Sequence, residues 1–367
     1  MKSVYSTRRE LAHAILKAYE LACVICAIDR GQITEESGET TMGRVVVLGS
    51  LITDLVARAP RLPYPGESLL GNDFDTFQGG KGINQAIAAR RLGAHVSLVG
   101  RVGIDTFGDE FFPILAAEEI SSAFIQRDPT IGTGVSLVII AEETGQNVIV
   151  ANPRANLAVP AETVIQALET AAAEAQKEGS GTGLFLTQCE TSRVSYLEGL
   201  RHARMLGMTT ILNAAPIPRE PLSDELFHLV DILIVNEVEA AALTQRPVTS
   251  LEAAQEAAED LLKKGPKHVV ITMGEQGALW STYQQDSPTP LPATEHQHLP
   301  PFAVKAVDAT AAGDAFCGAL AAHLVQNIPL PQALQRASAA GAVTVTRKGA
   351  IASLPTVHEV DELLQPH

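Results

Sequence analysis

The chain has 367 residues, 46% of them hydrophobic and 19% charged, so it is long enough to bury a large core in one α/β domain with an appendage or in two domains. Its formal net charge is −15 at pH 7, and its isoelectric point is near 5.1. Nucleic acids and anionic membranes bind basic surfaces, so this charge excludes both as the main partner.

The first 43 residues differ from the rest of the chain. The segment STRRELAHAILKAYELACVICAIDRG carries apolar residues at helical spacing, and a polar stretch follows it, which predicts an accessory helix and linker over residues 1–43. Its basic, amphipathic start leaves organelle targeting open as an alternative. Within it, Cys23 and Cys26 have a C-x-x-C spacing that no second pair completes into a zinc site. The four cysteines of the chain are scattered, which indicates a reducing compartment, and we expect the cytoplasm.

From residue 44 onward, apolar runs rich in β-branched residues alternate with helical patterns. The predicted strands are RVVVLGS (44–50), HVSLVG (95–100), LFLTQ (184–188), TTILNAA (209–215), DILIVNE (231–237) and HVVITMG (268–274). The predicted helices cover 82–92, 106–119, 161–177, 192–206, 237–243, 251–264, 313–325 and 331–346. Each strand is apolar on both faces, which predicts a parallel sheet with helices packed on its two sides.

Two segments break this alternation. RLPYPGESLLGNDFDTFQ (61–78) and GTGVSLVIIAEETGQNVIVANP (132–153) are strand-rich, and EETGQN is a hairpin signal. They predict a small separate sheet with strands within about 52–78 and 132–153. Such a sheet beside a parallel α/β body often covers a cleft, so we expect a lid, with surface decoration as the alternative. The Pro-rich stretch 281–302 predicts an irregular excursion.

Ligands of open parallel sheets bind beyond the carboxyl ends of the strands. These ends read GSLITD (49–54), TQCE (187–190), NAAP (213–216), NEVE (236–239) and TMGEQG (272–277). Their carboxylates, amides and glycines suit a small polar ligand with hydroxyl and phosphate groups. In the glycine-rich segment FQGGKGINQAIAARRLGA, Gly79, Gly80 and Gly82 are expected to let a ligand approach the backbone, and Asn84 lies in the first helical turn. The segment is neither a Walker A loop nor a dinucleotide fingerprint.

The segment VDATAAGDAFCGAL places small residues at the start of a predicted helix. Ala311, Ala312 and Gly313 leave backbone N–H groups exposed at the positive end of the helix dipole, which favours an anion such as a phosphoryl group in transfer. Asp314 follows in the first turn. The segment alone leaves two roles open for it: a base that takes a proton from an attacking hydroxyl, or an acid that only interacts with the dipole, worth about 0.3–1 kcal/mol.

Together, GGKGINQAIAARRLGA and VDATAAGDAFCGAL resemble the two signatures of the ribokinase family of carbohydrate kinases, in the same order and at a similar separation. The segments PGESLLGNDF, GRVGIDTFGDEF, GQNVIVANPRAN, VVITMGEQGALW and AAGAVTVTRKGAIASLP are also similar to that family, so the resemblance covers residues 44 to about 365. It implies one kinase domain over 44–367, built as a three-layer α/β sandwich with a central, mainly parallel sheet and a small β-sheet lid. It also implies a homodimer through the lid, and transfer of phosphate from ATP to the 5-hydroxyl of D-ribose.

The resemblance assigns roles to individual residues. Asp314 would be the general base, and Ala311, Ala312 and Gly313 would supply the anion hole. The positions that match sugar-binding residues are Asp54, Gly80, Lys81, Asn84, Glu190 and Asp314. Those that match the ATP site are Asn236, Thr272, Met273, Gly274, Glu275, Gln276, Gly277, Gly313 and Ser338, with Glu239 handling Mg²⁺ through water. Those that match a site for a monovalent cation, typically K⁺, are Asp308, Thr310, Thr344, Arg347, Gly349 and Ser353.

Some positions depart from the family pattern. Ile52 stands where an asparagine often contacts the sugar, which leaves deoxyribose, fructose or a related sugar open as the substrate. Ala309 and Ala311 replace threonine and glycine, although alanine keeps the backbone donors. Arg154 stands where glycine is common on the lid hairpin, so it is expected to alter lid closure or dimer contacts. A catalytically silent sugar-binding regulator is a further alternative, whereas a dehydrogenase would need the dinucleotide fingerprint that the chain lacks.

Overall fold

The computed structural model describes residues 43–284 and 293–365. The predicted accessory helix and linker, and the Cys23–Cys26 pair within them, lie outside the described residues, apart from residue 43. Among the helices of the described ranges, none is both long enough and apolar enough to cross a bilayer.

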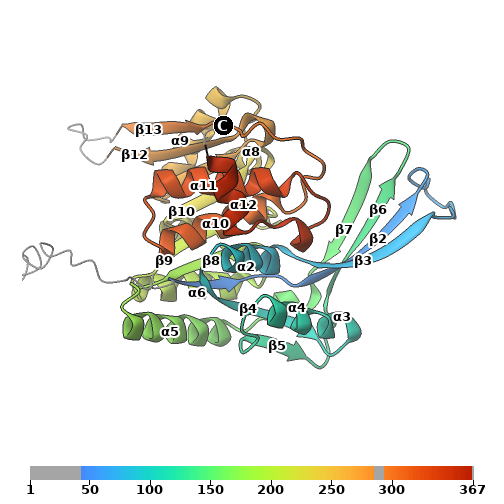
Figure 1. Ribbon diagram of the computed structural model, residues 1–367, viewed down its shortest axis with the longest axis horizontal. Helices are drawn as coiled ribbons and strands as arrows, with labels where there is room; N and C mark the ends of the chain where they lie inside the picture. The colour runs from blue at the N-terminus through green and yellow to red at the C-terminus, as the bar shows by residue number, and fades with distance from the viewer. Residues whose placement is uncertain (1–42, 285–292, 366–367) are drawn as a thin grey trace, which may run out of the picture. The chain divides into compact units, whose positions relative to one another are not determined.

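A large sheet forms the centre of the described chain (Figure 1). In the described residues its strands, in spatial order, are β13 (Thr294–Leu299), β12 (Ala278–Tyr283), β11 (His268–Thr272), β10 (Ile232–Asn236), β9 (Thr209–Asn213), β8 (Leu184–Gln188), β1 (Arg44–Leu48), β4 (His95–Gly103) and β5 (Ile125–Asp128). All neighbours from β11 to β5 pair in parallel, which confirms the sheet predicted from strands that are apolar on both faces.

Strands β12 and β13 pair antiparallel beyond β11. The prediction of a loop or irregular excursion over 281–302 was therefore wrong for 281–283 and 294–299, since β12 ends at Tyr283 and β13 covers Thr294–Leu299. The sequence TEHQHL of β13 has no apolar alternation because it is an edge strand with mostly exposed side chains, held by its ladder to β12.

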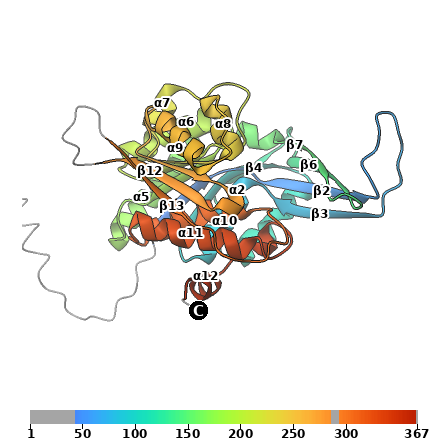
Figure 2. The ribbon, with the colours of Figure 1, turned by 90° about the horizontal axis from the view of Figure 1, so that it is seen from above.

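Helices cover both faces of the large sheet (Figure 2). Strand β1 shows why two covers are needed, because Val45 and Val47 join one buried cluster and Val46 and Leu48 join the other. The first cluster includes α2 (Lys81–Arg91), α4 (Phe111–Ala117), α10 (Ala312–Val325), α11 (Leu330–Thr344) and α12 (Val357–Leu364). The second includes α5 (Ala161–Glu178), α6 (Arg193–Met205), α7 (Asp224–His228), α8 (Glu237–Thr244) and α9 (Leu251–Leu262). Short elements are α3 (Thr106–Asp109), η1 (Arg154–Ala158), η2 (Gly274–Gln276) and η3 (Ile351–Ser353).

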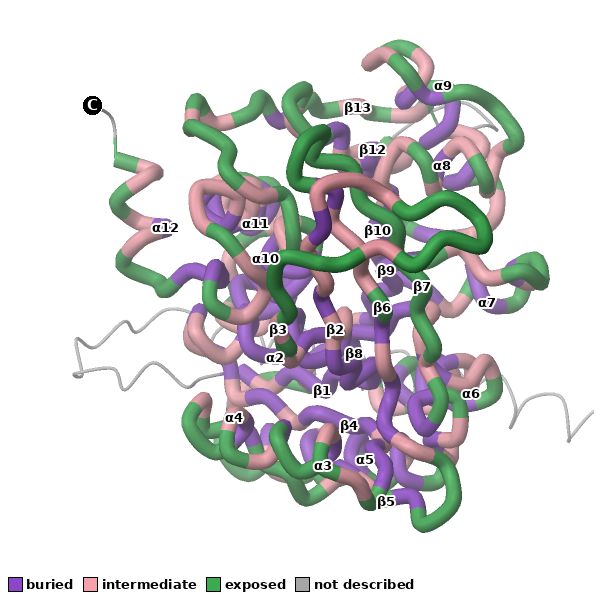
Figure 3. The backbone as a smooth tube through the Cα atoms, turned by 90° about the vertical axis from the view of Figure 1, so that its right-hand side faces the viewer, coloured by how far each residue is buried: buried purple, intermediate pink, exposed green. Residues whose placement is uncertain are grey.

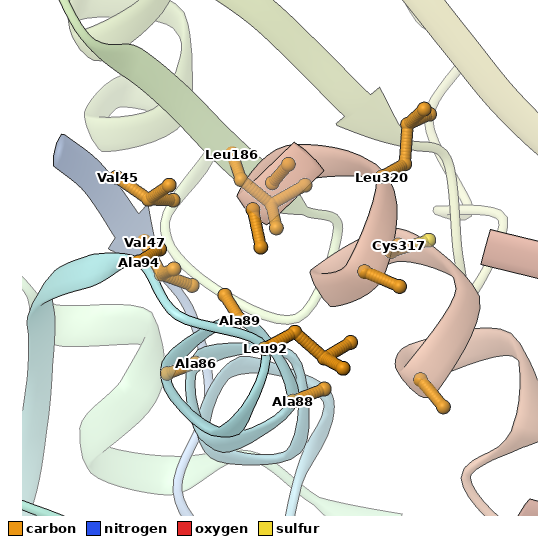
Figure 4. Close-up of a cluster of buried hydrophobic side chains, with 14 of the residues drawn as sticks. Val45, Val47, Ala86, Ala88, Ala89, Leu92, Ala94, Leu186, Cys317 and Leu320 are labelled. Carbon is orange, nitrogen blue, oxygen red and sulfur yellow. The ribbon is translucent and has the colours of Figure 1, made fainter. Parts of the chain in front are cut away.

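Helices α2 and α10 cross closely because both present small residues (Figure 4). Ala86, Ala89 and Cys317 are buried in this cluster. At Gly318 the approach is closest, since an added Cβ would lie 2.5 Å from the backbone oxygen of Gln85. The crossing therefore holds the first turns of the two predicted signature helices beside each other.

A second sheet stands apart from the large one (Figure 1). Its strands, in the described residues, are β3 (Asp73–Gly79), β2 (Ile52–Ala59), β6 (Gly134–Ala141) and β7 (Asn147–Asn152), in that spatial order. Figure 3 shows that much of its backbone is exposed or intermediate in burial. The small separate sheet predicted from the two strand-rich segments is thus confirmed.

His323 is buried in α10, and neither of its ring nitrogens has a hydrogen-bond partner within the described ranges. Burial, together with the positive charge of Arg336, lowers the pKa of His323 to about 4 in spite of the nearby Asp361. The unfolded chain therefore binds a proton that the folded chain excludes. The stability that the neutral ring contributes is fully present above about pH 6.5 and is lost as the pH falls toward 4.

We expect His323→Leu to flatten the decline in the free energy of unfolding between pH 6.5 and 4, a decline of a few kcal/mol in the parent chain. Urea denaturation at a series of pH values measures this. His358→Leu, at an exposed position of α12, is the matched control and should keep the parent's decline. An unchanged slope in the His323 variant would contradict the account.

Candidate active site

Asp314 is buried in the first turn of α10 and lies against α2. Its Oδ2 accepts a hydrogen bond from Asn84 Nδ2 at 2.9 Å, and its Oδ1 accepts one from Gln85 Nε2 at 2.9 Å. The structure thus joins the two glycine-rich signatures through direct contacts between side chains about 230 residues apart. A carboxylate held at the mouth of a helix N-terminus can accept a proton from a group bound there.

The backbone before Asp314 forms an open helix start. Ala311 is the N-cap of α10, with a left-handed φ of 61°, and the helix begins at Ala312, one residue before the predicted start. The first N–H groups of a helix have no acceptor within the helix, and here the N–H of Ala312 donates to the carbonyl of Ala309 before the helix at 3.3 Å. A Cβ added to Gly313 would meet no atom within 4 Å outside its own stretch of helix, so the side-chain position of this residue is open. This geometry suits an anion, as the sequence predicts.

Ala311 carries backbone strain that the family's usual glycine avoids. A left-handed conformation costs an L-residue about 1–2 kcal/mol. A glycine also raises the conformational entropy of the unfolded chain, which lowers the stability by about 0.4–1 kcal/mol. We expect Ala311→Gly to raise the free energy of unfolding by about 0.5–1 kcal/mol, measured by urea denaturation. Ala312→Gly, in ordinary helical backbone, should lower it by a similar amount, and a loss of stability in both variants would contradict the strain at Ala311.

Lys81 begins α2 among three carboxylates, those of Asp314, Glu190 and Glu239. Burial lowers the pKa of Lys81, but the negative charges of these carboxylates outweigh it and hold the pKa above its ordinary value. Glu190 accepts hydrogen bonds from Ser50 Oγ and from the backbone N–H of Lys81, the latter at 3.2 Å. Burial raises the pKa of Glu190. The predicted sugar-binding groups Lys81, Asn84 and Glu190 are therefore gathered around the start of α2.

Asp54 lies on β2 of the small sheet, and its Oδ2 lies only 3.0 Å from where a Cβ of Gly79 would be. Burial raises the pKa of Asp54, although a hydrogen bond with Ser136 lowers it. Because Gly79 ends β3 just before α2, the small sheet brings this carboxylate to the same region.

Gly80 and Gly82 have a packing reason in the structure, and the approach of a ligand to their backbone stays a prediction. Gly80 has a φ of 103°, and a Cβ on it would lie 2.8 Å from the backbone oxygen of Ser50. A Cβ on Gly82 would lie 2.3 Å from the backbone of Gly49. Both glycines serve the close packing of α2 on the loop after β1, and what lies opposite them could not be read from the sequence.

The predicted nucleotide residues Asn236 and Glu239 form a capping box at the start of α8. The Asn236 side chain accepts from the N–H of Glu239 at 2.8 Å, and Glu239 Oε2 accepts from the N–H of Asn236 at 2.9 Å. Burial raises the pKa of Glu239, so a bound cation would favour its ionised form. Its second carboxylate oxygen is the group that can face a hydrated Mg²⁺.

The remaining predicted nucleotide residues lie on two further elements. Thr272 ends β11, and the exposed η2 turn carries Gly274, Glu275 and Gln276 before Gly277. The Met273 side chain is buried, so only its backbone can face a ligand there. On α11, the Ser338 hydroxyl is buried without a hydrogen-bond partner in the described chain.

Four of the six residues predicted to hold a monovalent cation are linked by hydrogen bonds. Asp308 Oδ1 accepts from the N–H and hydroxyl of Thr310 at 3.0 and 2.7 Å, and its Oδ2 accepts from the N–H of Gly349 at 2.9 Å. The Ser353 hydroxyl donates to the carbonyl of Gly349 at 2.6 Å. Burial raises the pKa of Asp308, but these hydrogen bonds outweigh it and hold the pKa below its ordinary value.

The other two predicted cation residues sit at the end of α11. The N–H of Arg347 donates to the carbonyl of Thr344 at 3.3 Å, while its guanidinium pairs with Glu359 at 2.6 Å. Only the backbone of Arg347 can therefore serve a cation. The described residues contain no group of three or more His, Cys, Asp or Glu side chains that could hold a metal. The K⁺ site stays a prediction, and the oxygens near Asp308 include the Thr310 hydroxyl and the Gly349 carbonyl.

Several polar residues at this site were missed from the sequence. Gln188 Nε2 donates to Gln85 Oε1 at 2.6 Å, and Gln85 Nε2 donates to Asn213 Oδ1 at 3.1 Å. Gln188 and Asn213 belong to the strand-end segments TQCE and NAAP, and Gln85 follows Asn84 directly, so their positions were visible although their contacts were not.

The base of the small sheet holds two further polar residues. Asn156 accepts from the N–H of Leu51 and donates to its carbonyl, both at 2.9 Å, which ties η1 to the start of β2. Arg154 has a left-handed φ of 48°, the conformation for which glycine is common at that position. Its guanidinium donates to the carbonyl of Thr133 at 3.3 Å.

Comparison with known proteins shows the family to which the chain belongs. Residues 42–357 match the pfkB family carbohydrate kinase. The chain is 37% identical to ribokinase of Mus musculus over 319 residues, covering 86% of this chain and 93% of the relative. It is 30% identical to deoxyribokinase of Salmonella typhi over 320 residues, covering 87% and 98%. The structure of Arabidopsis thaliana ribokinase complexed with ribose and ATP has a TM-score of 0.74 and 28% identity, covering 89% of this chain and 100% of that chain.

The chain therefore belongs to the pfkB family of carbohydrate kinases. Within that family it is similar to ribokinases in both sequence and fold, as the two signatures indicated.

Proposed function

We propose that the chain transfers the γ-phosphoryl group of ATP to the 5-hydroxyl of D-ribose and releases ribose 5-phosphate and ADP. The observation that carries this proposal is the buried Asp314, held by α2 at the open N-terminus of α10. Asp314 takes the hydroxyl proton as the sugar oxygen bonds to the γ-phosphorus and the bond from that phosphorus to ADP breaks. The N–H groups of Ala311, Ala312 and Gly313 stabilise the charge on the phosphoryl oxygens.

The sugar is proposed to bind between the start of α2 and the small sheet. Asp54 and Glu190 accept hydrogen bonds from its hydroxyls, and Lys81 and Asn84 donate to them. This mixture suits a polyol, because each buried hydroxyl left unpaired costs affinity. The small sheet, which carries Asp54, would close over the sugar and exclude water.

ATP is proposed to lie across η2 and the start of α10, with Asn236 at its phosphates and Ser338 near its adenine ring. Glu239 would hold Mg²⁺ through water, and Mg²⁺ would neutralise the charge of the β- and γ-phosphates.

Asp308 and the loop around Gly349 are proposed to bind K⁺ beside the anion hole. We expect turnover to fall several-fold when tetramethylammonium replaces K⁺ at constant ionic strength. Ribose-dependent ADP release measures this, and equal turnover in both salts would contradict a K⁺ site.

The small sheet is also proposed to pair two copies of the chain. Strand register places Leu55, Leu137 and Val150 side by side on one face, and Leu137 and Val150 are exposed. A parent dimer and a monomeric Leu137→Glu variant in sedimentation velocity would support this interface.

A panel of sugars, scored by ADP release, tests the substrate. We expect D-ribose to give the highest kcat/KM, and a higher value for fructose or a nucleoside would overturn the proposal. Deoxyribose is the second candidate, favoured by the similarity to deoxyribokinase and by Ile52 at a sugar-contact position of the family.

A further inference from the structure

Gln85 is fully buried on α2, and no role described above uses it. Its side chain contacts three other elements. Its Nε2 donates to Asp314 Oδ1 on α10 at 2.9 Å and to Asn213 Oδ1 on β9 at 3.1 Å. Its Oε1 accepts from Gln188 Nε2 on β8 at 2.6 Å. Because both the nitrogen and the oxygen of this buried amide are hydrogen-bonded, its partners hold the Gln85 side chain in place.

The partners also fix which way the Gln85 amide faces. Asn213 uses its own Nδ2 to donate to the carbonyl of Ile234 at 3.2 Å, so its oxygen is left to face Gln85. Gln188 holds the Gln85 oxygen. If the Gln85 amide turned over, its oxygen would face the Asp314 carboxylate, and the Gln188 donor would lose its acceptor.

We propose that Gln85 is a positioning residue for Asp314, held in its donating orientation by Gln188 and Asn213. This inference rests on the proposed role of Asp314 as the base. Asn84 holds one carboxylate oxygen and Gln85 the other, so the plane of the carboxylate is fixed from α2. A base can take a proton only while its oxygen lies within about 2.6–3.2 Å of the proton donor. Free rotation of the Asp314 carboxylate would reduce the fraction of time that the oxygen spends at this distance.

The close helix crossing makes this arrangement possible. Gly318 lies one helical turn after Asp314 on α10, at the point where that helix meets the backbone of Gln85. Because no side chain separates the helices there, the Gln85 amide reaches the carboxylate directly. Through its hydrogen bonds with Gln188 and Asn213, Gln85 then connects Asp314 to the carboxyl ends of β8 and β9.

The first test is Gln85→Met, which keeps the length of the side chain but removes its donor. We expect kcat to fall about 10- to 100-fold, the effect of losing a hydrogen bond to a charged group, while the KM for ribose changes little. Gln126→Met is the matched control. Gln126 lies on β5, at the edge of the sheet, and its side chain also donates a hydrogen bond, to Thr163 at 2.6 Å. The control should keep the parent's kcat. If the loss of kcat in Gln85→Met is no larger than the loss of folded protein, the proposal is overturned.

The second test changes Gln188, which contacts Gln85 but makes no hydrogen bond to Asp314. Gln188→Glu puts an acceptor where the donor to Gln85 stands, so it repels the Gln85 oxygen and displaces the amide that donates to Asp314. We expect a loss of kcat of the same order as for Gln85→Met, again with little change in KM. A normal kcat in Gln188→Glu would overturn the proposal.

A double-mutant cycle separates this inference from the proposed function. In an Asp314→Asn background, Gln85→Met should cause no further loss of residual turnover, because both changes remove the same function. If Asp314→Asn is inactive but Gln85→Met keeps its kcat, or if the two losses multiply, the positioning role fails while the proposed base stands. If Asp314→Asn keeps its turnover, the proposed base fails, and the positioning role with it. If Gln85→Met does not fold, Gln85→Leu, which also removes the donor without adding a charge, gives the same readout.

Discussion

Asp314→Asn should lower kcat about 10²- to 10⁴-fold, the usual contribution of a general base, while the affinity for ribose stays close to that of the parent chain. The amide keeps the size of the side chain but cannot take the proton of the sugar hydroxyl. Asn84, Lys81 and Glu190 are unchanged in this variant, so the groups proposed to hold the sugar are still present.

Ribose-dependent ADP release gives kcat, and calorimetry gives the dissociation constant for ribose. Glu252→Gln, a first-turn acid of α9 on the opposite face of the sheet, is the matched control. If Asp314 only interacted with its helix dipole, both variants would lose about 0.3–1 kcal/mol of stability and little turnover. A kcat near the parent value in Asp314→Asn would contradict the assignment.

Gly82→Ala should lower the free energy of unfolding by about 1–3 kcal/mol or more, the cost of overpacking a tight contact. The added Cβ would lie 2.3 Å from the carbonyl carbon of Gly49 and 2.4 Å from the backbone nitrogen of Ser50. These are backbone atoms, so no flexible side chain can yield. Helix α2 would have to move, and Lys81, Asn84 and Gln85 would move with it.

Urea denaturation measures the loss, and Gly313→Ala is the matched control. A Cβ on Gly313 would meet nothing within 4 Å, so this change should leave stability unchanged or raise it by up to about 1 kcal/mol. Equal stability in the two variants would contradict the packing role of Gly82.

The large sheet could be predicted because its parallel strands are buried on both faces. The residues of β1 alternate between the two cores, so nearly every position must be apolar, and a run of such residues marks a strand. Strand β13 could not be predicted, since TEHQHL is an exposed edge whose order depends on its ladder to β12. Helix α7 was missed because five residues are too short to show helical periodicity.

The candidate site divides in the same way. The two signatures placed Asn84 and Asp314 in one region, and the structure brings them into contact. The contact of Gln85 with Asp314 depends on the approach of two helices at Gly318, a distance in space that no local pattern carries. The capping box of Asn236 and Glu239 was readable, because a helix that starts with N-x-x-E is a known capping pattern, but it gives these residues a local role beside the one proposed.

The position of the transferred phosphate tests the central claim most directly, since that claim sets a primary hydroxyl of the sugar against Asp314. The measurement is the proton-coupled phosphorus NMR spectrum of the product formed from ATP and D-ribose. A phosphate on C5 is split into a triplet by the methylene protons, and we predict this triplet with ADP in equal amount. A doublet, which marks a phosphate on a ring carbon that carries one proton, would contradict the account.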